Sequence, residues 1–313
     1  MSAVSGTPAA DARIARKQAP SRTRRPMPES LAGLLFIAPG LVLITLFFLL
    51  PFVMTLWMSL HAWPLLGHPH FIGLRNYAAM LHDQAFWHDV AFTVEYTVVI
   101  TAALFGLAFP LALFVARPRR GIGVLRTAYF LPAVIGLPSA SLLWVWLLND
   151  DSGLVSPLAE RLHLAAGPLA VLTSTNLTFL AVIVMVTWKM TGFTMMLLLP
   201  GLQSIPGEID EAASMDGANG WQRFRFITLP LMRPTLAMAL LVSITGSMLA
   251  FDQFYIISNG GPENATMTAV YRIFNTSFVS FHLGYGAALS VALLLLLVVI
   301  NFAQVILLRT PGE

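Results

Sequence analysis

The sequence has 313 residues with no cysteine, and only 11% of its residues are charged. A soluble domain usually carries about a quarter charged residues. Without cysteine there is no disulfide framework, no thiol nucleophile and no metal site with Cys ligands. Hydrophobic residue types make up 57% of the chain, and its mean hydropathy is +0.76. These values exclude an ordinary soluble domain and indicate a membrane protein.

Sequence motifs for nucleotide binding and hydrolysis are also missing. There is no G-x-x-x-x-G-K-[ST] loop for nucleotide phosphates, no G-x-S-x-G nucleophile elbow and no H-E-x-x-H zinc helix. The net charge of +3 comes from basic residues scattered among apolar segments, which argues against a nucleic-acid partner. We therefore expect no enzyme activity and no cofactor in this chain, and any energy for transport must come from another protein.

Six apolar stretches are long enough to cross a bilayer, which takes about 20 helical residues. They lie near residues 31–60, 90–116, 124–148, 177–202, 231–257 and 285–308. We predict an all-α polytopic membrane protein with six transmembrane helices in one domain, residues 30–313. The first stretch is too long for a signal-peptide core, so we expect it to be retained. Residues 1–29, rich in Ala, Ser, Pro and Arg, are predicted to form a flexible cytoplasmic tail.

The distribution of basic residues predicts the orientation in the membrane. Most lie in the tail, in the loops after the second and fourth spans, and at the C-terminal end: Arg13, Arg16, Lys17, Arg22, Arg24, Arg25, Arg117, Arg119, Arg120, Arg126, Arg223, Arg225, Arg233 and Arg309. The opposite loops hold only Arg75, Arg161 and Arg272. The positive-inside rule then places both termini in the cytoplasm. All seven histidines fall on or near separate outer loops, and we expect no metal site among them.

A polar segment, EAASMDGANGWQRFRFITLP, runs from Glu211 to Pro230 between two apolar stretches. The residues before it are typical of a helix start, with Pro206 in the first turn and Ser204 as a candidate cap. We predict a helix to about Met215 and a turn allowed by Gly217 and Gly220.

A second short helix is predicted from Trp221 to Leu229, stopped by Pro230. Two interpretations of this helix-turn-helix remain open on the residues alone. It is a docking site for another protein, held to its own membrane helices by Trp221, Phe224 and Phe226, or it is an amphipathic hairpin that lies on the lipid headgroups.

The segment contains E-A-A-x-x-D-G-A, then F, then I-x-L-P, as Glu211 to Ala218, Phe224 and Ile227 to Pro230. This resembles the EAA motif in the membrane subunits of binding-protein-dependent ABC importers. Other segments resemble the carbohydrate-uptake branch, which includes maltose and glycerol-3-phosphate permeases: Gly73 to Tyr77, Leu131-Pro132 with Trp144 and Trp146, Leu202 to Pro206, and Asn259 to Pro262. The chain departs from the family pattern at Val94-Glu95, where an Asn-Thr pair is typical.

The resemblance implies a type I ABC importer permease fold in a bacterial cytoplasmic membrane, carrying a sugar or sugar-derived solute. It implies a coupling helix that docks on a cytoplasmic ATPase through Glu211, Ala212, Ala213, Asp216, Gly217 and Ala218. The implied partners are a second homologous permease subunit, a dimer of ATP-binding subunits that hydrolyses the ATP, an extracytoplasmic solute-binding protein and the membrane lipid.

Two spans carry faces of small and hydroxyl residues at helical spacing: Ser243, Gly246, Ser247 and Ala250 in the fifth, and Thr187, Thr191 and Thr194 in the fourth. Such faces also pack membrane helices together without any ligand. The resemblance to the larger maltose permease subunit implies that Thr187, Phe193, Ser243 and Ser247 line the substrate pathway. An aromatic ring and hydroxyls would suit a carbohydrate.

Charges inside a span are costly and suggest function. Glu95 and Asp252 lie near the outer ends of their spans, but Lys189 lies well inside and shares the helix face of Phe193. We consider two hypotheses for Lys189, an ion pair with a carboxylate such as Asp252 or a contact to an anionic solute on the substrate pathway. The ion pair is favoured because neutral sugars dominate the family that this chain resembles.

Two other classes of protein are weighed against an importer subunit. A self-sufficient secondary transporter should show an internal inverted repeat and broken helices with charges at the midplane. A membrane-embedded enzyme should show ionisable residues converging at one depth. The sequence shows neither pattern.

Overall fold

The computed structural model describes residues 29–117, 119–149, 153–163 and 171–308. The predicted tail, residues 1–29, lies outside these ranges except for its last residue and stays a prediction. The chain forms two compact units, one up to Val53 and one from Met54 onward.

The described part of the first unit, from Glu29 onward, is helical throughout. Helix α1 (Glu29–Ile44), the π-helical turn η1 (Thr45–Leu49) and helix α2 (Leu50–Ser59) follow one another without interruption. The last helix continues into the second unit at Met54. The stretch Phe36–Ser59 has 24 residues and is apolar enough to cross a membrane, in agreement with the first predicted span.

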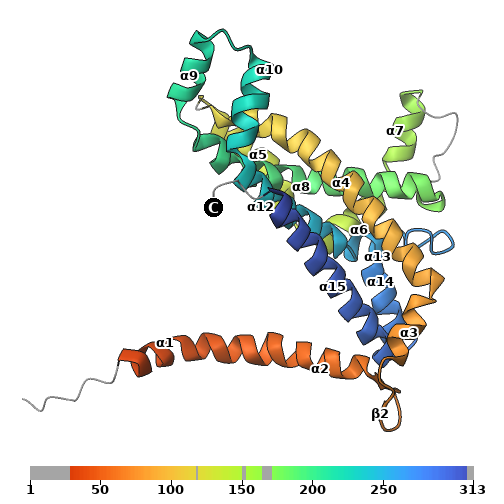
Figure 1. Ribbon diagram of the computed structural model, residues 1–313. Coiled ribbons are helices and arrows are strands. Elements are labelled where there is room, and N and C mark those ends of the chain that lie inside the picture. The colour runs from red at the N-terminus through yellow and green to blue at the C-terminus, as the bar shows by residue number, and fades with distance from the viewer. Residues whose placement is uncertain (1–28, 118, 150–152, 164–170, 309–313) are drawn as a thin grey trace, which may run out of the picture. The chain divides into compact units, whose positions relative to one another are not determined.

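The second unit is almost entirely helical (Figure 1). Its elements are β1 (His61–Ala62), β2 (His70–Phe71), α3 (Arg75–Leu81), α4 (Gln84–Ala116), α5 (Ile122–Val134), α6 (Leu137–Leu148), α7 (Val155–Arg161), η2 (Val171–Thr173), α8 (Thr175–Gln203), α9 (Gly207–Met215), α10 (Gly220–Arg223), η3 (Phe224–Thr228), α11 (Leu229–Leu231), α12 (Arg233–Met248), α13 (Asp252–Ile257), α14 (Ala269–Phe274), η4 (Asn275–Val279) and α15 (Leu283–Leu308). The two short strands form an antiparallel pair.

Within the described residues, five helical segments are long and apolar enough to span a membrane: Phe36–Ser59, Gln84–Ala116, Thr175–Gln203, Arg233–Ile257 and Leu283–Leu308. The pair α5 and α6 makes a sixth span if the two helices are counted together. The prediction of an all-α, six-span membrane protein is thereby confirmed.

The third span is not the continuous helix that was expected over residues 124–148. It breaks between Val134 and Leu137, where its two halves are bent by 90°. At the break Ile135 takes an extended conformation, Gly136 is the N-cap of α6, and Pro138 lies in the first turn of α6, where proline is tolerated. The fifth span also has an interruption, between α12 and α13, although it still qualifies as one crossing.

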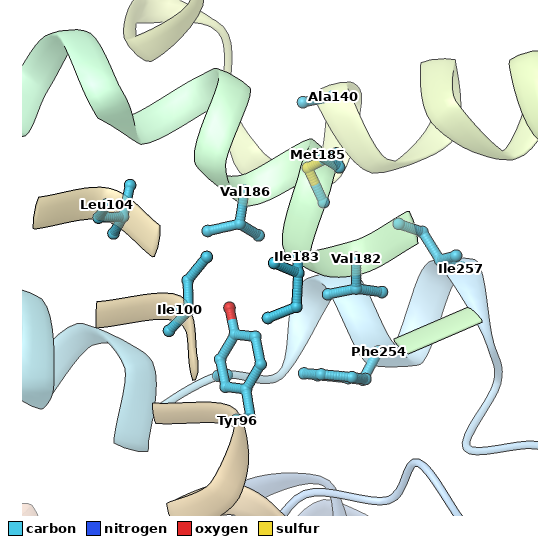
Figure 2. Packing of buried hydrophobic residues seen from close by; sticks show 11 residues of the cluster. Tyr96, Ile100, Leu104, Ala140, Val182, Ile183, Met185, Val186, Phe254 and Ile257 are labelled. Atoms are coloured by element: carbon cyan, nitrogen blue, oxygen red, sulfur yellow. The ribbon is translucent and has the colours of Figure 1, made fainter. Parts of the chain in front are cut away.

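Helices α4 and α8 form the centre of the second unit. Tyr96, Ile100 and Leu104 of α4 pack against Val182, Ile183, Met185 and Val186 of α8, joined by Ala140 of α6 and by Phe254 and Ile257 of α13 (Figure 2). Gly192 of α8 lies directly against the backbone of α5 at Tyr129, where no Cβ atom could fit. This close approach places the break of the third span next to the middle of α8.

Candidate functional site

The polar segment folds as a helical hairpin at one end of the bundle (Figure 1). Helix α9 ends in a Schellman motif, in which the Ala218 amide donates to the Ala213 carbonyl and the Gly217 amide to that of Ser214. Gly217 has a φ of 79°, a left-handed conformation that strains any other L-residue by about 1–2 kcal/mol. The glycine predicted at the turn is therefore required by the backbone and not by crowding, since nothing lies within 4 Å of a Cβ there.

The second half of the hairpin is fixed by polar contacts. Asn219 and Gln222 form a reciprocal capping box at the start of α10. Arg223 then reaches back to Asp210 of α9, with 3.1 Å between Nη1 and Oδ2. The two arms of the hairpin are thus tied together, and the described contacts explain why it holds a defined shape.

Every predicted coupling residue lies on the accessible surface of this hairpin. None of the residues of α9 is buried. Glu211, Ala212, Asp216 and Gly217 are exposed, and Ala213 and Ala218 are partly exposed. Beside the turn lies a shallow cavity of about 310 Å³, lined in part by Asp216, Gly217 and Ala218. The arrangement offers a small-residue surface and a depression to another body.

Three local expectations for the hairpin are wrong. Ser204 does not cap α9, because its hydroxyl donates to the Gly201 carbonyl at the end of α8. Pro230 does not stop the second helix, because proline is tolerated where a new helical turn begins and α11 continues through it. Of the three aromatic anchors, Phe224 alone packs on a membrane helix, against Phe109 of α4, whereas Trp221 and Phe226 are 68% and 72% exposed.

A cavity of about 180 Å³ lies inside the bundle between α4, α8 and α12. It is lined by Phe193 of α8 and by Ser243, Gly246 and Ser247 of α12, so three of the five residues predicted for the substrate pathway come together. The Ser247 hydroxyl donates to the Ser243 carbonyl at 2.8 Å, whereas the Ser243 hydroxyl is buried without a partner. A buried polar group with no partner is unusual and marks a position where a ligand could supply the hydrogen bond.

Two further polar residues of this cavity were not predicted. Tyr96 and Gln253 both line it, and the Gln253 amide nitrogen donates to the Tyr96 hydroxyl at 3.1 Å. The Gln253 amide oxygen has no partner. In Figure 2 the Tyr96 hydroxyl points away from its backbone toward the space among Ile100, Ile183 and Val186. A glutamine and a tyrosine within apolar spans were the available signal in the sequence.

Thr187 does not belong to this cavity. It lines a separate cavity of about 730 Å³ between α4, α5 and α8, together with Thr191, Tyr129 and Trp188. The Thr187 hydroxyl is buried and unpartnered there. The threonine stripe expected on one face is therefore divided, because Thr194 lines the cavity of Phe193 and Ser243.

Lys189 has a different partner from the one expected. Its side chain is buried, with 2% exposed, and its ammonium donates to the Ala133 carbonyl at 3.1 Å. The three ion pairs among the described residues join other groups, so the expected pair with Asp252 is wrong. Ala133 lies in the last turn of α5, where carbonyls lack helical partners and a cation is favoured. Lys189 thus caps the half-helix at the break of the third span.

The other end of the bundle holds a charge pair that the sequence analysis missed. Asp89 of α4 is 1% exposed and binds Arg272 of α14 with 2.5 Å between Oδ2 and Nε, although 183 residues separate them. Asp83 caps α4 and also accepts a hydrogen bond from the Tyr285 hydroxyl at 2.7 Å. Glu95, by contrast, lies exposed on α4. Among the described residues, no three His, Asp or Glu side chains gather as a metal site.

Comparison with known proteins identifies relatives over nearly the whole chain. The family described as binding-protein-dependent transport system inner membrane component matches residues 34–310. The chain is 33% identical to an sn-glycerol-3-phosphate transport system permease protein of Agrobacterium fabrum, covering 88% of this chain and 94% of that protein. It is 33% identical to a trehalose/maltose transport system permease protein of Thermococcus litoralis, with coverage of 89% and 93%. A probable starch degradation products transport system permease protein of Thermoanaerobacterium thermosulfurigenes is 31% identical, with coverage of 87% and 92%.

The fold also matches a solved structure. A chain of a bacterial ABC transporter involved in the import of the acidic polysaccharide alginate superposes with a TM-score of 0.78 at 19% sequence identity. The match covers 91% of this chain and 97% of that chain. At that identity the likeness concerns the fold alone.

Proposed function

The chain belongs to the family of binding-protein-dependent transport system inner membrane components, and we propose that it is the permease subunit of a bacterial ABC importer for a sugar or sugar-derived solute. The observation that carries the proposal is the hairpin of α9 and α10, whose turn has a defined conformation and whose first helix has no buried residue among those that the structure describes. Since this chain has no nucleotide-binding loop, a separate ATPase must supply the energy.

The hairpin is the proposed docking site for that ATPase. Glu211 and Ala212 would enter a socket on the ATPase, and Gly217 would hold the turn in the conformation that the socket fits. A rigid hairpin suits this role because a force applied to it is transmitted to α8 and α12 without being absorbed by bending. The positive-inside rule supports a cytoplasmic location for the hairpin and both termini, since the basic residues gather in the loops on that side.

The partners follow from the same scheme. A second homologous permease would complete the pathway, two ATP-binding subunits would drive it, and an extracytoplasmic binding protein would deliver the solute. A structural match in which an alginate transporter is in complex with a pentasaccharide-bound periplasmic protein supports the last of these, with a TM-score of 0.75. The chain itself would have no enzyme activity and no cofactor.

The solute is proposed to be a neutral carbohydrate. The described residues lining the cavity between α4, α8 and α12 include none with a charged side chain. Phe193 offers a ring for a sugar face, while Ser243 and Gln253 offer unpartnered hydrogen-bonding atoms for hydroxyls. Lys189 supports this assignment, because its ammonium is engaged by the Ala133 carbonyl. The cavity is smaller than the roughly 300–1,000 Å³ of complete ligand pockets, as expected if the second permease contributes the other half.

The test is a pair of substitutions in the hairpin. Gly217→Val and Glu211→Lys should leave the permease in the membrane with its partner permease but abolish uptake by the complete transporter in proteoliposomes. Gly121→Val is the matched control, because Gly121 has a similar φ of 86° and no atom within 4 Å of its Cβ position, but lies outside the hairpin. Normal uptake by an assembled Gly217→Val complex contradicts the coupling role. Gradient-driven uptake by the purified chain alone would favour a secondary transporter.

A further inference from the structure

A large cavity lies at the same end of the bundle as the hairpin. Its volume is about 1110 Å³, and it is bounded by the end of α4, the start of α5, the end of α8 and the first turn of α9. Four arginines line it: Arg117, Arg119, Arg120 and Arg126. Apolar side chains, among them Leu113, Ile122 and Leu202, line the rest of the wall.

The arginines have positive charge that no carboxylate neutralises within the described part of the chain. Asp210 is the acidic residue lining the cavity, and it is engaged by Arg223 outside it. Arg126 is partly buried and held in place, since one guanidinium nitrogen donates to the Val115 carbonyl. Its Nε is buried without any partner. The cavity therefore combines one guanidinium that is held in place and has an unpartnered nitrogen, that of Arg126, with three exposed arginines whose charge is available to an anion.

The position of the cavity indicates where the anion comes from. Arg117 directly follows α4, and Gln203 ends α8, so both mark the ends of apolar segments long enough to cross a bilayer. The ends of such segments lie at the level of the lipid headgroups. A wall that is basic on one part and apolar on another matches an amphiphile with a phosphate at one end and hydrocarbon at the other.

We propose that this cavity binds an anionic phospholipid, with the phosphate on the arginines and the first part of the acyl chains against Leu113, Ile122 and Leu202. Arginine forks match phosphate oxygens in geometry and charge, and basic pockets between membrane helices are suited to acidic headgroups. Gly207 and Asp210 of α9 form part of the same wall. The bound lipid thus braces the hairpin against α4 and α5.

The test measures lipid bound to the complete transporter by native mass spectrometry after exchange into phosphatidylglycerol or phosphatidylcholine. We expect phosphatidylglycerol to be retained preferentially. The double substitution Arg119→Gln and Arg120→Gln should weaken its binding by about tenfold or more, because each arginine near an anionic lipid contributes several-fold. Both side chains are exposed, so the variant should fold. The matched control is Arg75→Gln with Arg161→Gln, which removes the same charge from exposed arginines elsewhere.

Inorganic phosphate at millimolar concentration distinguishes a lipid from a soluble anion. Phosphatidylglycerol that resists displacement by phosphate, and is lost in the cavity variant but kept in the control, supports the proposal. Equal retention of phosphatidylcholine, unchanged binding in the cavity variant, or displacement by inorganic phosphate overturns it. So does a cavity variant that keeps its lipid but loses the ATPase subunits, which would assign the arginines to a protein partner.

Discussion

Replacing Lys189 by methionine tests the role that the structure gives this buried charge. Two opposing terms set the expected effect on stability. Removing a charge that is 2% exposed relieves a burial cost of about 2.5–3.5 kcal/mol on insertion scales. Removing the donor loses a charge-assisted hydrogen bond worth about 1.5–3 kcal/mol and leaves the Ala133 carbonyl without this partner.

The two terms nearly cancel, so Lys189→Met should change the unfolding free energy by no more than about 1 kcal/mol. Methionine is unbranched and flexible, and it fills much of the space that the lysine stem occupies. The corresponding shift in Tm is below about 4 °C for a protein of this size. Lys189→Ala is the control, because it also opens a cavity and should cost about 2–5 kcal/mol. Adding Asp252→Asn to either variant should leave its unfolding free energy unchanged.

The assay is thermal unfolding of the purified transporter together with uptake of its solute into proteoliposomes. Assembly and uptake of the transporter's solute should survive in Lys189→Met. A fall in Tm of more than about 10 °C would refute the reasoning, because the ammonium would then have a stronger partner than the Ala133 carbonyl. Loss of uptake with an unchanged Tm and intact assembly would show instead that Lys189 contacts an anionic solute.

Three further substitutions test packing, charge and the cavity. Gly192→Ala should lower the Tm of the complex by 5 °C or more, because the added Cβ atom would collide with the backbone of α5. Gly106→Ala is the control and should not lower the Tm, since no atom lies within 4 Å of its Cβ position. Equal effects of the two substitutions would contradict the close approach of α8 to α5. Asp89→Asn should destabilise the complex by about 1.5–3 kcal/mol, because it removes the charge-assisted hydrogen bond between the carboxylate and the partly exposed Arg272 guanidinium. A loss below about 1 kcal/mol in denaturant unfolding would contradict this. Ser243→Ala should leave the stability of the complex unchanged or raise it slightly, because it removes a buried hydroxyl that has no partner. The same substitution should raise the KM for uptake. An unchanged KM would show that Ser243 does not line the substrate pathway.

The sequence by itself determined the features that depend on short stretches of chain. The six spans follow from runs of apolar residues, and the hairpin follows from Pro206 and Gly217, whose preferences are local. The exposure of the polar segment could be predicted for the same reason, since a polar segment between spans must lie outside the hydrocarbon. The conformation of a segment of ten or twenty residues depends mainly on the intrinsic backbone preferences of its own residues.

The tertiary structure alone decided which groups meet. Thr187 lines a different cavity from Phe193 and Ser243. Helical periodicity predicts the direction in which each side chain points, but the cavity that the side chain lines depends on where the neighbouring helices pack. The partner of Lys189 is the Ala133 carbonyl and not a carboxylate, because Ala133 lies at the break of the third span, where carbonyls lack helical partners.

The pairing of Asp89 with Arg272 was beyond the reach of sequence spacing for the same physical reason. The two residues are 183 positions apart, and only the packing of α14 against α4 brings them together. Helical periodicity states which residues share a face, whereas the partner of that face depends on how every other helix packs. The chain thus encodes its spans and its hairpin locally, and the contents of its cavities through the fold as a whole.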